Sequence, residues 1–138
     1  MDRRSPTAER HAQTLRIALM EAAPAGLAFP QLMSVCELSR HQVRSGLGAL
    51  RDICAERGWP PILWNRAKGY RFSADADELE AWERAWAGVK TIQIRRMVTG
   101  TLAPHAKLFP KSRWVKYMLA QMTAVESALD MIANPQLQ

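Results

Sequence analysis

The chain has 138 residues, of which 48% are hydrophobic and 23% charged, and its formal net charge is +6. This length fits one ordinary domain with an appended element, and the apolar fraction is too high for a disordered chain. Collagen, a coiled-coil rod, a secreted disulfide scaffold and a large α/β enzyme are excluded, and no apolar run reaches the roughly 20 residues of a membrane span. The charged start of the chain is unlike a signal peptide.

The charges are distributed in three blocks. Residues 1–72 carry 11 basic and 6 acidic side chains, residues 73–89 carry 1 and 5, and residues 90–138 carry 7 and 2. Arg supplies 14 of the 19 basic residues, and its guanidinium binds phosphate and guanine bidentately. The pattern favours a polyanionic partner, and an Ala-rich composition offers a second explanation for the Arg content.

The two cysteines, Cys36 and Cys54, fit a reducing cytoplasm. Both fall on apolar sides of predicted helices, so we expect buried, inert thiols. The three histidines are too scattered to complete a zinc site, which needs about four closely spaced ligands. We therefore predict a cytoplasmic protein with no metal and no cofactor.

Three helices are predicted in the first half of the chain, over residues 7–23, 30–36 and 39–57, with a short extended segment at 27–29. Ser39 and Gln42 have the spacing of a capping box at the start of the third helix, and Gly58 is expected to end it. The side chains expected to face the core are Leu15, Ala18, Leu19, Leu32, Val35, Cys36, Val43, Leu47, Leu50 and Cys54.

A β-hairpin and two longer helices are predicted after Gly58. Residues 62–64 and 70–72 are expected to be strands, joined by a tight turn at 67–69. A second capping-box pattern, Asp75 with Glu78, predicts a helix that reaches about Thr99. Residues 101–111 contain two prolines and are expected to form a loop, and Ser112 is expected to cap a final helix to about Ala133.

The segment Gly26-Leu27-Ala28-Phe29-Pro30 through Leu38-Ser39-Arg40-His41-Gln42-Val43 to Leu47-Gly48-Ala49-Leu50 resembles the bacterial winged helix-turn-helix transcription regulators. The hairpin that ends Lys68-Gly69-Tyr70-Arg71-Phe72 resembles their wing. This resemblance covers about residues 10–73. It implies a mainly α fold with a β-hairpin wing, in which residues 1–74 form the DNA-binding domain and residues 75–138 a helical region.

The helix over 39–57 has the pattern of a helix that reads DNA, with an apolar docking side and a polar N-terminal half. Arg40 and Arg44 are one turn apart, so both can enter the major groove. There Arg favours guanine and Gln favours adenine. Arg51 lies further along and is expected at a phosphate.

The predicted wing alternates basic with apolar residues, as expected of a hairpin that contacts the DNA backbone. With the recognition helix, it completes the predicted set of DNA contacts. That set is Ser39, Arg40, His41, Gln42, Arg44, Ser45, Arg51, Arg66, Lys68 and Arg71.

The C-terminal helices carry apolar stripes at heptad-like spacing, which is typical of a dimerisation region. The alternative is that they fold back on the first domain as core. The residues predicted to form the homodimer are Leu79, Trp82, Trp86, Val89, Met118, Met122, Val125 and Leu129. The basic residues between Lys90 and Lys116 could contact phosphate or balance the acidic block.

These observations predict a sequence-specific DNA-binding transcriptional regulator, most simply a homodimeric repressor, and no enzyme. No nucleophile–base pair, Gly-rich phosphate loop or metal-ligand cluster is visible in the sequence. The alternatives are a winged-helix module that binds a protein partner, and an accessory DNA-binding protein in phage or plasmid replication or excision.

Overall fold

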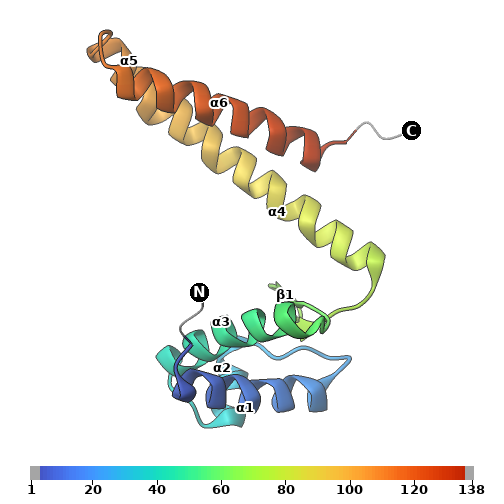
Figure 1. The fold of residues 1–138 in the computed structure, drawn as a ribbon. Helices are drawn as coiled ribbons and strands as arrows, with labels where there is room; N and C mark the ends of the chain where they lie inside the picture. The colour runs from blue at the N-terminus through green and yellow to red at the C-terminus, as the bar shows by residue number, and fades with distance from the viewer. Residues whose placement is uncertain (1–3, 136–138) are drawn as a thin grey trace. The chain divides into compact units, whose positions relative to one another are not determined.

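The computed structural model describes residues 4–135 as a mainly helical protein with one two-stranded antiparallel hairpin (Figure 1). The chain divides into two compact units, Met1–Leu79 and Glu80–Gln138. The boundary predicted at residue 74 precedes this division by five residues.

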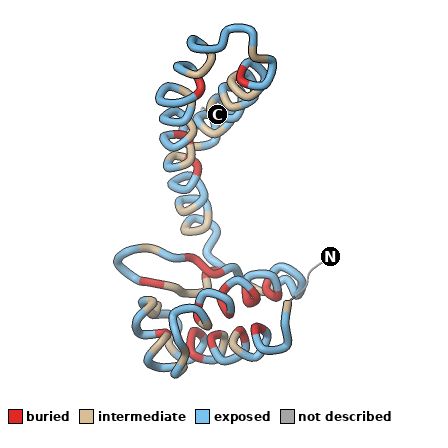
Figure 2. The backbone as a smooth tube through the Cα atoms, turned by 90° about the vertical axis from the view of Figure 1, so that its left-hand side faces the viewer, coloured by how far each residue is buried: buried red, intermediate tan, exposed pale blue. Residues whose placement is uncertain are grey.

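Three helices form most of the first unit: α1 (Pro6–Ala22), α2 (Phe29–Cys36) and α3 (Arg40–Arg57). Ser5 caps α1 by accepting a hydrogen bond from the backbone N–H of Ala8 at 3.0 Å. The helices turn their apolar sides toward one another, and the buried residues follow the facing sides of α1 and α3 (Figure 2). Leu15, Leu19, Val43 and Leu50 are at most 1% exposed, so this core holds the unit together.

A three-residue turn connects α2 to α3 and sets the direction of α3. Glu37 adopts the left-handed conformation, with φ 53°, and so ends α2. The predicted capping box is confirmed: Gln42 N–H donates to Ser39 Oγ at 3.1 Å, and Ser39 N–H donates to Gln42 Oε1 at 2.9 Å. Gly58, with φ 66°, ends α3 as predicted.

The hairpin consists of β1 (Ile62–Asn65) and β2 (Gly69–Phe72), with Ile62 opposite Phe72. The turn is at residues 66–68, one position earlier than predicted. Leu27, just before α2, adds a one-residue bridge to β2: its N–H donates to Tyr70 O at 2.9 Å, and Tyr70 N–H donates to Leu27 O at 2.8 Å. This bridge attaches the hairpin to the helices.

Two glycines make that attachment possible. A Cβ on Gly26 would lie 2.1 Å from the Lys68 carbonyl oxygen, and one on Gly69 would lie 2.5 Å from the Leu27 carbonyl oxygen. Gly69 also has φ 75°, which side-chain-bearing residues rarely adopt. Only glycine at these positions lets the two backbones approach so closely.

The second unit is a helical hairpin. Its elements are α4, which begins at Ala76 in the first unit (Ala76–Met97), the π-helical turn η1 (Val98–Leu102), α5 (Ala103–Leu108) and α6 (Arg113–Ala133). α6 runs back antiparallel beside α4 (Figure 1). Arg95 Nε lies 3.3 Å from Glu126 Oε2, and a Cβ on Gly88 would lie 4.0 Å from the Ala133 Cβ.

The loop predicted over residues 101–111 is wrong for most of its length. Pro104 lies in the first turn of α5, where its missing N–H leaves no hydrogen bond unmade. The chain therefore stays helical through Gly100 and Pro104, and only residues 109–112 connect α5 to α6.

Two further predictions need correction. Val35 is 60% exposed and does not face the core, because the short helix α2 contributes mainly Leu32. The capping box at the start of α4 is half formed: Asp75 Oδ1 accepts from Asp77 N–H and Glu78 N–H, but the Glu78 carboxylate accepts a hydrogen bond from Arg71 instead of closing the box.

Candidate nucleic-acid interface

The exposed side of α3 carries a group of polar and basic side chains on its N-terminal half. Val43 is buried at this point and anchors the helix, whereas Arg40, His41, Arg44 and Ser45 are exposed. Arg40 and Arg44 lie one turn apart on the same side, as the sequence predicts. The helix thus presents donors outward while its opposite side is fixed in the core.

Ser39 and Gln42 have the capping role that their spacing predicts. The two side chains are occupied with the backbone N–H groups at the start of α3. Their role in the structure is to begin the helix and hold its first turn.

Arg51 is exposed two turns beyond Arg44, and Gly48 lies between them. No atom lies within 4 Å of the position a Gly48 Cβ would take. Gly46 differs, because a Cβ there would meet Leu15 Cδ1 at 2.6 Å. The packing of α1 against α3 explains Gly46, and nothing inside the first unit explains Gly48.

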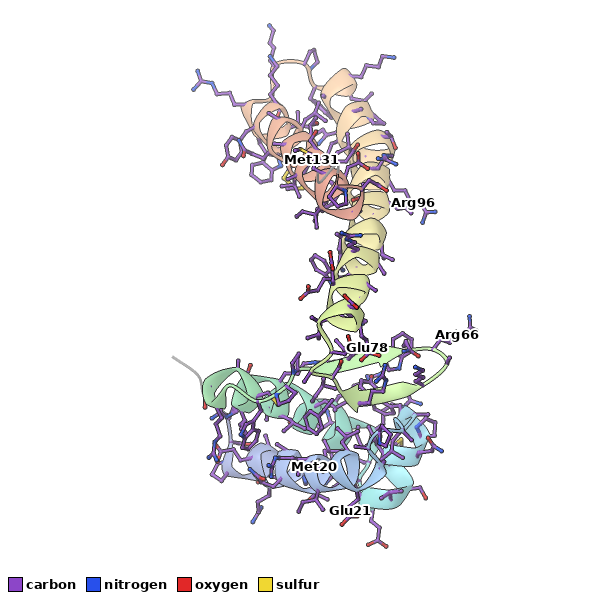
Figure 3. The ribbon with its side chains drawn as sticks, turned by 90° about the vertical axis from the view of Figure 1, so that its right-hand side faces the viewer. Met20, Glu21, Arg66, Glu78, Arg96 and Met131 are labelled. Atoms are coloured by element: carbon purple, nitrogen blue, oxygen red, sulfur yellow. The ribbon has the colours of Figure 1, made fainter. Side chains whose placement is uncertain are left out.

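The turn of the hairpin adds two more cations. Arg66 and Lys68 are exposed there, and Arg66 projects away from the rest of the first unit (Figure 3). Lys68 N–H donates to Asn65 Oδ1 at 2.6 Å, which fixes the turn. Both side chains are therefore displayed on a constrained loop.

Arg71 does not belong to this exposed set. Its guanidinium is paired with the Glu78 carboxylate, and its side chain is only 13% exposed. The alternation of basic and apolar residues in the hairpin predicts Arg71 as a DNA contact. In the structure, its side chain lies between β2 and the start of α4.

A series of ring contacts links the start of α3 to the hairpin. The Arg40 guanidinium lies 5.6 Å from the Phe29 ring centroid, Phe29 lies 6.3 Å from Tyr70, and Tyr70 lies 6.4 Å from Trp64. Arg40 is thus on the side of α3 that continues into the hairpin. The sequence contains these aromatic residues, but their spacing does not reveal that they meet.

The charges on this surface are mostly uncompensated. Within residues 4–135, Arg44, Arg51, Arg66 and Lys68 form no ion pair with a carboxylate. Toward the other end of α3, Glu56 pairs with Arg4 at 2.6 Å, and this hydrogen bond lowers the pKa of the Glu56 carboxyl. We call the set Arg40, His41, Arg44, Ser45, Arg51, Arg66 and Lys68 the basic surface.

Other kinds of site receive little support. Burial raises the pKa of the Cys36 thiol and of the Cys54 thiol, which lowers the thiolate fraction that metals and electrophiles require. Cys36 is half-buried and not fully buried as predicted. In the described part of the chain, no three His, Cys, Asp or Glu residues come together as a metal site. None of the described helices is both long and apolar enough to cross a bilayer.

Comparison with family models, characterised proteins and solved structures finds no match to this chain. The functional argument therefore depends on the basic surface itself.

Proposed function

We propose that the first unit is a winged helix-turn-helix domain that binds double-stranded DNA and reads its sequence, and that the protein acts as a transcriptional regulator. The exposed basic N-terminal half of α3 carries this proposal. An α-helix fits the major groove, which is about 12 Å wide. Arg40 and Arg44 supply the bidentate donors that recognise guanine, while His41 and Ser45 flank them.

The hairpin is the wing in this proposal. Arg66 and Lys68 at its tip bind phosphate or the minor groove beside the site that α3 reads. The ring contacts from Arg40 to Trp64 support a single continuous surface, because they fix the wing on the side where α3 begins.

Selection of bound duplexes from a random DNA pool at about physiological salt tests the proposal. We expect an enriched motif, and an affinity for the selected duplex that falls steeply as salt rises because phosphate contacts release counterions. A folded protein that enriches no motif would refute sequence reading. In that case a salt-dependent affinity would indicate nonspecific DNA binding, and salt independence would favour a protein-binding module.

Gly48 offers a second test, because a Cβ added there has no atom within 4 Å and a larger side chain would obstruct only a molecule that approaches α3. Gly48→Ala is expected to raise the free energy of unfolding by about 0.5–1 kcal/mol, since glycine is a poor helix residue. Gly48→Gln, which adds bulk within the basic surface, is expected to weaken binding of the selected duplex at least tenfold. Urea denaturation and fluorescence anisotropy measure the two effects.

Ala55→Gln is the matched control for Gly48→Gln. Ala55 is exposed on a similar side of α3 but two turns nearer its C-terminus, so its substitution should leave DNA affinity unchanged. Equal losses of affinity in the two variants would mean that the effect does not come from contact at Gly48.

Alanine substitutions of Arg71 and Lys68 distinguish a residue that stabilises the wing from one that binds DNA. Arg71→Ala is expected to lower the free energy of unfolding by about 1–3 kcal/mol, because it leaves the half-buried Glu78 carboxylate without its charged donor. Lys68→Ala removes the same charge from an exposed position. It should weaken DNA binding while keeping stability within about 0.5 kcal/mol. The opposite pattern would place Arg71 at the DNA and Lys68 outside it.

A further inference from the structure

The hairpin of α4 and α6 packs along one side and leaves a second side uncovered. Toward α6, α4 presents Ala87 and Thr91, and these two are buried. Toward α4, α6 presents Val115 and the half-buried Met118, Met122 and Leu129. Three of the residues predicted to form a dimer, Met118, Met122 and Leu129, are thus half-buried on the same side of α6 as Val115.

A different set of large apolar side chains stays in solvent. Trp86 is 48% exposed and Trp114 is 62% exposed, and other members are similarly open. With about 100° per residue, the exposed apolar residues Trp86, Val89 and Met97 lie within about 80° of one another around α4. Trp114, Val125 and Ile132 lie within about 20° of one another around α6. We call the set the outer face, and it consists of Trp86, Val89, Met97, Trp114, Val125 and Ile132.

Helix geometry places both halves of the outer face on one side of the hairpin. With about 100° per residue, the apolar stripe of α4 is rotated by roughly 130° from its side facing α6, and that of α6 by roughly 90° from its side facing α4. Viewed along each helix from its own N-terminus, the two rotations run in the same direction. Because the two helices are antiparallel, equal senses bring the stripes to the same side.

This unit on its own lacks a core. Among its described residues, only Ala87, Thr91, Leu102 and Val115 are buried, which is little for a unit of this size. The outer face is about 30 Å long on α6, from its 21 residues, and about 17 Å long on α4, from Trp86 to Met97. A patch of this extent marks an interaction site.

We propose that the outer face binds the outer face of a second copy of the chain, so that two hairpins form a four-helix bundle in which they run antiparallel. The charges select this arrangement. The closed end of the hairpin, where α5 and the following turn join α4 to α6, carries Arg96, Lys107, Lys111, Arg113 and Lys116, and no acidic residue occurs between Glu83 and Glu126. The open end carries the carboxylates Glu80, Glu83 and Asp130 beside the cations Arg84 and Lys90, and Arg84 pairs with Glu80. Arg95 and Glu126 pair with each other between the two ends.

An antiparallel pair brings each basic closed end beside the carboxylates of its partner's open end, whereas a parallel pair would place two basic ends together. Like charges oppose association of a parallel pair, and the apolar contacts of the outer face favour neither the parallel nor the antiparallel orientation. The proposal uses the second unit alone and is independent of whether the first unit binds DNA.

Sedimentation of the full chain tests whether the outer face binds a second copy of the chain. We expect twice the chain mass of 15.6 kDa at tens of micromolar protein. Val125→Glu, within the outer face, should raise the dimer dissociation constant at least 100-fold. Met131→Glu is the matched control, because Met131 is 72% exposed on α6 and lies about 120° around the helix from Val125.

A monomeric wild type would overturn the proposal, and this result needs no variant to fold. A wild-type dimer that Val125→Glu leaves intact, with the helix content of the variant unchanged by circular dichroism, would overturn the assignment of the face. A loss of dimer in Met131→Glu equal to that in Val125→Glu would do the same.

Spin labels at the closed end test the orientation. In a Cys36→Ser background, Lys111→Cys is the only accessible thiol within the described residues, since Cys54 is 4% exposed. Pulsed EPR on the dimer should give about 30 Å or more between the two labels, which is the length of α6. A separation below about 20 Å would establish a parallel pair and overturn the antiparallel arrangement.

Discussion

Replacing Arg40 and Arg44 together by alanine is expected to abolish sequence-specific binding to the selected DNA. A bidentate Arg–guanine contact is worth about 1–3 kcal/mol, so two of them predict a loss of roughly 30-fold to 10⁴-fold in affinity. Both side chains are exposed, and alanine is the best helix residue. Arg40 also loses its contact with the Phe29 ring, so the free energy of unfolding should stay within about 1 kcal/mol of the wild-type value.

A double variant with the same change in net charge provides the control. Arg10→Ala with Arg57→Ala removes two exposed cations that lie outside the basic surface, so its affinity should fall by no more than a small, salt-dependent factor. Fluorescence anisotropy on the selected duplex and on a scrambled duplex measures both variants. If the Arg40/Arg44 variant kept its preference for the selected duplex, α3 would not be the recognition helix.

The largest effect on stability is expected for Gly26→Ala. The added Cβ would lie 2.1 Å from the Lys68 carbonyl oxygen and 2.9 Å from the Tyr70 carbonyl oxygen. Both obstacles are backbone atoms of the wing, so no side chain can move aside. The segment must shift and lose the two hydrogen bonds between Leu27 and Tyr70, at a cost of about 3–5 kcal/mol.

Gly48→Ala is the matched control, because it makes the same chemical change where no atom lies within 4 Å. Urea denaturation should therefore give a free energy of unfolding below the wild-type value for Gly26→Ala and above it for Gly48→Ala. A Gly26→Ala variant within 1 kcal/mol of the wild type would show that the wing is not held by this close approach.

Local signals in the sequence were sufficient for much of the first unit. Ser39 and Gln42 predict the start of α3 because a capping box is made by residues three apart, and Gly58 predicts its end because glycine adopts the left-handed conformation freely. The repeat of Val43, Leu47 and Leu50 likewise identifies the buried side of α3. Each of these signals acts within a few residues, where no tertiary contact competes.

The failures occur where distant residues decide the outcome. Glu78 has the spacing to complete a cap, yet Arg71 competes for its carboxylate across the end of the hairpin. Pro104 looks like a helix breaker, yet it lies in the first turn of α5, where proline is tolerated. Spacing also identifies apolar residues on α6, but it does not separate Leu129, which faces α4, from Val125 on the outer face.

The candidate site was predictable in part for the same reason. The exposed positions of Arg40, His41, Arg44 and Ser45 follow from helical periodicity. The contacts from Phe29 to Tyr70, which place the wing beside them, join residues far apart in the chain. No local sequence pattern predicts such a contact.

The bridge between Leu27 and Tyr70 has a consequence for the order in which the first unit folds. A hairpin of two four-residue strands is at best marginally stable alone, and this bridge closes a loop of more than forty residues. The helices must pack before that closure becomes favourable. The wing is therefore the last part of the first unit to form and the first to open, and the amides of Leu27 and Tyr70 exchange with solvent together, ahead of those in α1 and α3.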